Sequence, residues 1–420
     1  MNNESENLIL SGQTPLRGQV KVQSSTPITI FLLCLSFILN KKSKLLGDFN
    51  SQVTLDFLTK IRVFGFEVMN TGDTLESLNY SGDSDNVFFS GADFASSLIL
   101  TLMLAKRGGV EVLNNKDLIS FYNYLGFEVK GEEAKYFVSN KVGKDSKSSI
   151  TFHTLNEQYY YIAILTLLLN NKEFSISSID LTYELNILIE LLKELGFVKD
   201  VVYGNFITVN FDFTNVEKSV FEKLKVPGDP KEYIFYCVSS IATGGEIEVV
   251  GLDPKMVAST LKVFSSLGVG FESISESSLK IWWGKDSKFE TASITDTDEY
   301  LDFTKLCLIP CIATSLRKEE QPIYVSLNTE KYRSYLQDIN ILGGNIEIDE
   351  KGVTINEVSK IKGGKLTLSD TGEIENYARL IIALTSRITI KDFTNLVYYN
   401  HGLLNKLESL GGKIEYDIAN

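Results

Sequence analysis

Histidine is almost absent from this chain, and cysteine is scarce. Its 420 residues include only two histidines, His153 and His401, and four cysteines. So small a number of these side chains disfavours a Cys/His metal site and a histidine-based catalytic triad. The cysteines lie within apolar helical patterns, so we expect them to be small core residues. We therefore expect no metal and no cofactor.

Positive charge is also in short supply. The formal net charge is −13, and seven of the 41 basic residues are arginines. An acidic chain without a basic tract does not favour nucleic acid or anionic membranes as partners. Few arginines also means few rigid two-point contacts to phosphate or carboxylate. We expect neither nucleic acid nor membrane among its partners.

Long apolar runs are missing as well. The longest, residues 28–39, is about a dozen residues and falls short of the roughly 20 that a membrane helix needs. The N-terminal sequence MNNESENLILSG lacks the basic and apolar regions of a signal peptide. We expect a cytoplasmic protein, acting as a monomer.

What the sequence does contain is one pattern repeated six times. A helix-like stretch ends in Leu-Gly or Phe-Gly and continues into an alternating strand. The glycines are Gly65, Gly126, Gly196, Gly268, Gly343 and Gly411, spaced 61 to 75 residues apart. A glycine at this place is typical of a helix end with positive φ. Upstream of it come an apolar helix, a β-branched strand and an amphipathic helix.

Six such units of about 70 residues predict a mixed α/β protein with two domains of three units each. The segment KLKVPGDPKEY, residues 223–233, carries Pro227, Gly228 and Pro230 and falls between the third and fourth units. We place the domain boundary there.

The first apolar helix opens at an ambiguous turn, Gln23–Thr26 in the stretch VQSSTPITIFLL. A helix start offers free N–H groups and a positive dipole end, which suit an anion. Ser25 and Thr26 are also good N-caps, and Pro27 suits a first helical turn. Spacing favours an ordinary cap, and a weakened anion site is the alternative.

Six βαβαββ-type units in two domains resemble the enolpyruvyl transferase family, whose members include 5-enolpyruvylshikimate-3-phosphate synthase and UDP-N-acetylglucosamine enolpyruvyl transferase. The resemblance implies a two-domain, inside-out α/β barrel-like fold. It also implies that the first strand joins the C-terminal domain. The domains would then be residues 1–20 with 228–420 and residues 21–227, with hinges near 18–22 and 225–230.

The shikimate-pathway branch, which serves aromatic amino acid biosynthesis, resembles this chain better. Its Pro-Gly-Ser-Lys-Ser-Ile-Thr motif lies over residues 23–29, where Ser25 matches and Thr26 replaces the lysine. Its Ser-Ser-Gln motif keeps Gln158, and Asp229 matches the Gly-Asp opening of its second domain. These matches imply that Ser25, Thr26, Gln158 and Asp229 bind substrate.

The resemblance implies catalytic roles for three further residues. Asp302 lies where the family keeps an active-site aspartate, and Glu330 with Lys331 lies under its Glu-Thr-Asp-Arg motif. The alternatives are that Asp302 is a surface acid or an acid at the N-terminus of a helix, and that Gln158 is simply solvated. Glu330 and Lys331 would open a helix, where a plain exposed charge pair is the alternative. Arg379 would replace a lost cation only if the helix register differs.

Several cations of the family are missing. The Gly-Thr-Ala-Met-Arg motif lies over residues 91–95 without its arginine. The Asp-His-Arg motif falls near residues 370–373 without its histidine and arginine, and the later lysine region reads VYY at 397–399. Bringing two phosphates and two carboxylates together needs preorganised cations.

We therefore expect enolpyruvyl transfer from phosphoenolpyruvate to shikimate 3-phosphate to be impaired or lost, as in a pseudoenzyme. If the chain is active, its partner is a small anionic substrate in the interdomain cleft. The alternative is a non-catalytic protein that binds a different ligand, or a protein partner, in that cleft.

Overall fold

The computed structural model divides the chain into two compact units. Unit 1 comprises residues 1–23 and 228–420, and unit 2 comprises residues 24–227. The structure describes residues 7–417 except 13, 82–87, 90–93, 114, 133–134, 143–146, 155–156, 215–220, 284–288, 290–292, 296–300, 317–320, 357–360, 369–372, 392 and 394–401. The chain passes between the units at Gln23–Ser24 and returns at Pro227–Gly228. The predicted hinges at these places stay predictions.

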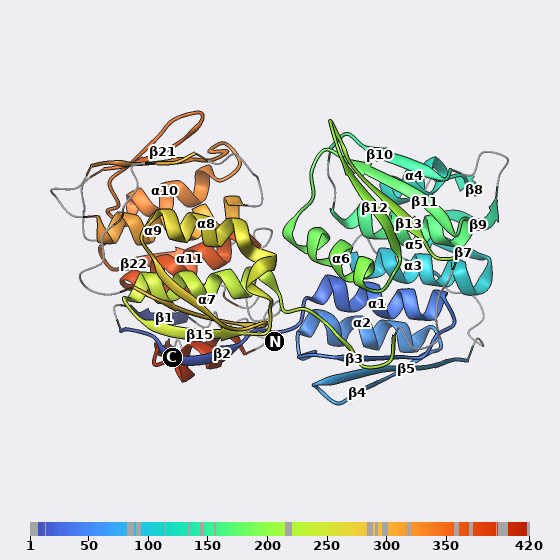
Figure 1. The fold of residues 1–420 in the computed structure, drawn as a ribbon, viewed down its shortest axis with the longest axis horizontal. Helices are drawn as coiled ribbons and strands as arrows, with labels where there is room; N and C mark the ends of the chain where they lie inside the picture. The colour runs from blue at the N-terminus through green and yellow to red at the C-terminus, as the bar shows by residue number, and fades with distance from the viewer. Residues whose placement is uncertain are drawn as a thin grey trace. The chain divides into compact units, whose positions relative to one another are not determined.

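Unit 2 contains three βαβαββ repeats (Figure 1). The first consists of β14 (Leu224–Lys225), α1 (Thr26–Ile38), β3 (Ser43–Leu46), α2 (Gln52–Val63), β4 (Phe66–Asn70) and β5 (Thr74–Tyr80). The second consists of β6 (Phe88–Phe89), α3 (Phe94–Arg107), β7 (Gly109–Leu113), α4 (Lys116–Tyr124), β8 (Phe127–Glu132) and β9 (Lys135–Val142). The third consists of β10 (Ser149–Phe152), α5 (Glu157–Asn170), β11 (Glu173–Ser178), α6 (Tyr183–Glu194), β12 (Val198–Tyr203) and β13 (Ile207–Asp212).

Unit 1 repeats the same order three more times. Its first repeat consists of β2 (Arg17–Lys21), α7 (Pro230–Thr243), β15 (Glu246–Val250), the short 3₁₀ helix η2 (Pro254–Val257), α8 (Ala258–Ser266), β16 (Gly270–Ser275) and β17 (Ser278–Trp282). The next consists of β18 (Ser293–Ile294), α9 (Leu301–Ser315), β19 (Ile323–Ser326), α10 (Arg333–Ile341), β20 (Ile346–Ile348) and β21 (Gly352–Ile355). The last consists of β22 (Gly364–Thr367), α11 (Glu373–Thr385), β23 (Arg387–Lys391), α13 (Leu403–Ser409), β24 (Lys413–Asp417) and β1 (Asn7–Ser11).

Each repeat forms its own four-stranded sheet with one parallel pair and two antiparallel pairs. In the second repeat of unit 2 the order is β6-β7-β9-β8. Strand β6 pairs parallel with β7, and β9 pairs antiparallel with both β7 and β8. The six-unit α/β architecture predicted from the sequence is thereby confirmed.

Strands from distant parts of the sequence complete three of the sheets. Strand β1 lies between β23 and β24, and β2 pairs parallel with β15, so the N-terminal segment belongs to unit 1. Strand β14, near residue 225, pairs parallel with β3 and completes the first sheet of unit 2. These long-range pairs hold both crossing segments of the chain in place.

Three apolar helices form the core of each unit. Helices α1, α3 and α5 pack on one another in unit 2, and α7, α9 and α11 do so in unit 1 (Figure 1). A helix that is apolar on all sides is stable only when buried on all sides. In α1, for example, every residue from Ile28 to Phe37 is buried. The four cysteines are free and buried in these helices, as predicted.

The six repeat glycines all adopt positive φ, between 76° and 99°. The left-handed conformation costs other residues energy because their Cβ atom crowds the following carbonyl. The glycine therefore ends each amphipathic helix and redirects the chain into the next strand. The prediction of six helix C-termini from these glycines is confirmed.

An aromatic cluster brings the N-terminal turns of the core helices together in each unit. In unit 2 the Tyr161 ring of α5 lies 5.7 Å from Phe31 of α1 and 5.2 Å from Phe94 of α3. In unit 1 the Tyr377 ring of α11 lies 5.2 Å from Phe235 of α7 and 5.9 Å from Phe303 of α9. The positive ends of three helix dipoles therefore converge in each unit.

Candidate functional site

Ser25 occupies the N-cap position of α1, but its hydroxyl does not cap the helix. The hydroxyl makes no cap hydrogen bond, and the residue is fully buried. Among the described residues its Oγ has no hydrogen-bond partner at all. Ser25 is therefore at the predicted N-cap position, but the predicted capping hydrogen bond from its side chain is wrong. A buried hydroxyl without a partner costs about 1–3 kcal/mol, so it needs an explanation.

Thr26 joins the start of α1 to the start of α2 through hydroxyl groups. Its Oγ1 lies 2.9 Å from Ser51 Oγ, which in turn donates to Thr54 Oγ1 over 2.8 Å. Ser51 also caps α2 by accepting from the Thr54 N–H at 3.2 Å. The position that resembles the family lysine is thus part of an uncharged hydroxyl chain.

Gln158 connects the first turns of α5 and α3. Its Nε2 donates to Ser97 Oγ over 2.9 Å, and the side chain is half-buried. Gln158 is therefore held by a hydrogen bond to a neighbouring helix, which distinguishes it from a simply solvated side chain. The contact places an amide at the convergence of the helix N-termini, where the sequence predicts a substrate-binding residue.

Two further buried hydroxyls border Phe152 in the same unit. Tyr160 in α5 stacks on Phe152 at 5.8 Å, and Ser178 is the register partner of Phe152 in the parallel pair β10–β11. Both residues are fully buried, and neither oxygen has a partner among the described residues. Burial raises the pKa of Tyr160, so it stays protonated. Neither residue was identified from the sequence as a site residue.

One lysine reaches the helix ends of unit 2. Lys60 of α2 places its Nζ 3.5 Å from Ser96 Oγ in the first turn of α3. The first turns of α1 and α3 contain no acidic residue, and α5 has only Glu157. In the part of these ends that the structure describes, the first turns therefore carry more hydroxyl groups than charged groups.

In unit 1 the N-termini of the core helices carry acidic side chains instead. Asp229 is the N-cap of α7 and accepts hydrogen bonds from the backbone N–H groups of Lys231, at 2.8 Å, and Glu232, at 3.1 Å. Glu232 is fully buried, with its Oε1 2.8 Å from Lys406 Nζ and its Oε2 accepting from the Gln23 N–H at 2.6 Å. The predicted substrate ligand Asp229 thus has a structural task in capping the helix.

Asp302 lies in the first turn of α9, as the sequence suggested, and is buried rather than on the surface. Lys305 Nζ is 3.6 Å from its Oδ1, and the lysine side chain is only 1% exposed. Lys305 was not identified from the sequence. Its polar position three residues after Asp302, in an otherwise apolar helix, is a signal that could have found it.

Glu330 and Lys331 do not open a helix. Both are exposed and lie in the turn before α10, which begins at Arg333. Lys331 Nζ lies 5.1 Å from the centre of the Tyr332 ring. Because β18 and β19 are parallel, this turn and the start of α9 follow strand ends at the same edge of the sheet. The pair therefore shares that edge with Asp302.

Arg379 does not replace a lost cation. It is buried in α11, with Nε 2.9 Å from Asp338 Oδ2 and Nη1 3.2 Å from Glu375 Oε2. Two carboxylates already neutralise it. The motif matches at residues 91–93, 156, 370–372 and 397–399 lie outside the described residues, as does most of the acidic segment 295–302.

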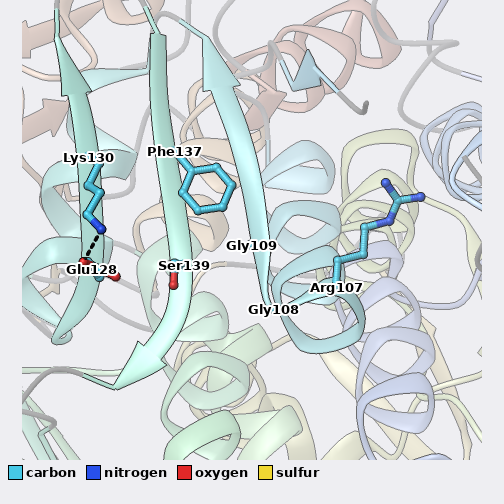
Figure 2. Close-up of a pocket in the computed structure, with 7 residues that line it drawn as sticks. All are labelled: Arg107, Gly108, Gly109, Glu128, Lys130, Phe137 and Ser139. Carbon is cyan, nitrogen blue, oxygen red and sulfur yellow. Dashed lines mark ion pairs between the residues drawn. The ribbon is translucent and has the colours of Figure 1, made fainter. Parts of the chain in front are cut away.

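The sheet β6-β7-β9-β8 carries a shallow hollow of about 520 Å³ (Figure 2). Gly109 lacks a side chain there, and a Cβ would stand 2.4 Å from the Phe137 ring. Lys130 pairs with Glu128 at 2.6 Å, and Arg107 and Ser139 complete the lining. None of the seven predicted site residues lines this hollow.

The described part of the chain contains no cluster of three or more His, Cys, Asp or Glu side chains suited to a metal ion. Within it, no helix is both long and apolar enough to cross a membrane. Tyr160 and Tyr161, in the tyrosine run at 159–161, are fully buried.

No family model and no curated protein matches the sequence. Solved structures do match the fold. The enolpyruvyl transferase NikO from Streptomyces tendae is similar with a TM-score of 0.77 and 14% identity, covering 99% of this chain and 100% of that chain. EPSP synthase from Acinetobacter baumannii is similar with a TM-score of 0.73 and 15% identity, covering 98% and 100%. A second structure of that synthase gives a TM-score of 0.72 at 14% identity, covering 98% and 99%. The chain therefore has the fold of the enolpyruvyl transferases.

Proposed function

We propose that the protein binds a small polyhydroxylated molecule of low negative charge at the converging N-termini of α1, α3 and α5. We further propose that it does not transfer an enolpyruvyl group from phosphoenolpyruvate. The observation that carries the proposal is a set of buried hydroxyls, at Ser25, Tyr160 and Ser178, that have no hydrogen-bond partner among the residues that the structure describes.

The chemistry of these groups selects the class of ligand. A hydroxyl offers one donor and two acceptor positions, which pair well with the hydroxyls of a sugar-like ring. Each oxygen is penalised by about 1–3 kcal/mol when buried and unpaired, and a ligand hydroxyl would remove that penalty. The Gln158 amide beside Ser97 adds a further polar contact at the same helix ends.

Low charge follows from the shortage of cations. Phosphoenolpyruvate brings a phosphate and a carboxylate, and each charge-assisted hydrogen bond contributes about 1.5–3 kcal/mol. At the unit 2 helix ends, Lys60 is the one cation that the described contacts place there. One lysine can neutralise a single carboxylate, such as that of shikimate. It cannot neutralise two substrates that each carry a phosphate and a carboxylate.

Retained enolpyruvyl transfer is the second candidate, and the buried Asp302–Lys305 pair favours it. An ammonium group beside a carboxylate can serve as a general acid–base pair, one to protonate an enol carbon and the other to receive a hydroxyl proton. The reaction would release inorganic phosphate, and binding alone would not, so phosphate release distinguishes the two candidates.

Isothermal titration calorimetry with shikimate, methyl shikimate, shikimate 3-phosphate and phosphoenolpyruvate tests the proposal. We expect micromolar to millimolar binding of shikimate and of its uncharged methyl ester. Shikimate 3-phosphate should bind no more tightly, phosphoenolpyruvate should give no heat, and no phosphate should appear. Phosphate release from shikimate 3-phosphate with phosphoenolpyruvate would establish the second candidate instead. Absence of heat with every ligand would refute both.

A further inference from the structure

Each of the three core helices of unit 1 has an acidic residue in its first turn that forms an ion pair with a lysine or arginine side chain. In α7 the pair is Glu232–Lys406 at 2.8 Å, in α9 it is Asp302–Lys305 at 3.6 Å, and in α11 it is Glu375–Arg379 at 3.2 Å. At least one partner in each pair is no more than 4% exposed. The positive end of every core helix in this unit therefore already has an anion.

Unit 2 has no such arrangement in its first two core helices. The first turns of α1 and α3 contain no acidic residue, and they include the hydroxyl residues Thr26 and Thr29 in α1 and Ser96 and Ser97 in α3. Both units share the helix trio and the aromatic cluster at its N-terminal end. The difference in charge therefore comes from the side chains and not from the fold.

Glu232 is the most completely enclosed of the three acids. Its carboxylate is fully buried and takes donors from two remote segments, the Gln23 N–H on Oε2 and Lys406 Nζ on Oε1. Burial, and after it the nearby Glu232 carboxylate, raises the pKa of Tyr236, which keeps that neighbour neutral. An ammonium, a backbone N–H and a helix N-terminus around one small anion are the donors with which proteins bind phosphate or carboxylate.

We propose that Glu232 is a specificity-determining residue that excludes anionic ligand groups from unit 1 by occupying an anion site with its own carboxylate. This inference goes beyond the proposed function, because Glu232 and Lys406 belong to unit 1 and the proposed ligand site belongs to unit 2. A phosphate approaching the α7 end meets a resident negative charge and finds Lys406 already neutralised. Removing that charge frees the Lys406 ammonium for an external anion.

The test is phosphate binding by the Glu232→Gln variant. Glutamine has nearly the same shape, and its carbonyl can still accept from the Gln23 N–H. We expect Glu232→Gln to bind inorganic phosphate at least tenfold more tightly than the wild type in calorimetric titrations. Adding Lys406→Met to that variant should abolish the gain, because the freed ammonium is then absent.

Glu246→Gln is the matched control. Glu246 pairs with Lys280 at 2.7 Å in the same unit, but it is exposed and begins β15, just after the C-terminal end of α7. The control changes net charge by the same amount, so it should bind phosphate no better than the wild type. Equal gains in both variants would show a general charge effect and overturn the proposal.

Folding gives a second readout. If Glu232→Gln is unfolded in phosphate-free buffer, circular dichroism should show it regain structure as phosphate is added. A folded variant with no gain in phosphate affinity, or an unfolded one that phosphate does not rescue, overturns the proposal. Titration with methyl shikimate tests the proposed function at unit 2 separately. Its failure is therefore distinguished from failure of the phosphate-binding test at Glu232.

Discussion

Replacing Tyr160 with phenylalanine tests whether its hydroxyl is retained for a ligand. The oxygen is buried without a partner among the described residues, while the ring stacks on Phe152. The variant deletes only the oxygen and leaves the ring in place. Removing an unpaired buried hydroxyl should relieve about 1 kcal/mol of a 1–3 kcal/mol penalty. In a unit of about 200 residues this raises the melting temperature by about 2–4 °C.

Tyr335→Phe provides the opposite case. Tyr335 is equally buried, but its hydroxyl donates to the Leu306 carbonyl over 2.7 Å. Deleting that hydroxyl leaves a buried carbonyl unpaired and should cost about 1–2 kcal/mol, so this variant melts at a lower temperature. Differential scanning calorimetry of both variants measures the two signs side by side.

Ligand affinity completes this test. We expect Tyr160→Phe to bind methyl shikimate about 2- to 12-fold more weakly, the range of one lost hydrogen bond of 0.5–1.5 kcal/mol. Tyr335→Phe should leave that affinity unchanged. A Tyr160→Phe protein that is destabilised like Tyr335→Phe, with unaltered binding, would refute the reasoning.

Three further predictions concern the fold. Lys406→Met leaves the buried Glu232 carboxylate without its cation. It should lower the free energy of unfolding by about 3 kcal/mol, at the low end of the range for buried pairs because Lys406 is 21% exposed. Urea denaturation measures this loss, and a loss under 1 kcal/mol would contradict the prediction. Gly196→Ala should cost about 1–2 kcal/mol from backbone strain alone, since φ is 76° and a Cβ there meets nothing within 4 Å; an unchanged urea midpoint would argue against the positive φ. Burial raises the pKa of the Cys34 thiol, and all four cysteines are buried. A thiol reagent at pH 8 should therefore modify none of them in the native protein and all four after unfolding. Rapid labelling of the native protein would show that the cysteines are not in the core.

The architecture was predictable because its signals are local. The glycine that follows Leu or Phe at each helix end, as at Gly126, needs only its own backbone geometry to be recognised. Apolar helices such as α1 reveal their burial through composition alone. The closing strands are harder, because β14 finds its partner β3 almost 180 residues away, and no pattern within two residues identifies it.

The candidate site was predictable only in part. Gln158 and Asp302 were placed by resemblance, and both are at helix N-termini in the structure. The missing cap bond of Ser25 depends on where its hydroxyl points, which the spacing of residues does not encode. The Glu232–Lys406 pair joins residues 174 positions apart, so only the folded chain reveals it.

The most direct test of the central claim is one titration series with methyl shikimate and with phosphoenolpyruvate, on the wild type and on Ser25→Ala. We predict saturable heat with methyl shikimate that is weakened by Ser25→Ala, and no heat with phosphoenolpyruvate on either protein. Tight binding of phosphoenolpyruvate, or binding of methyl shikimate that is indifferent to Ser25, would contradict the account.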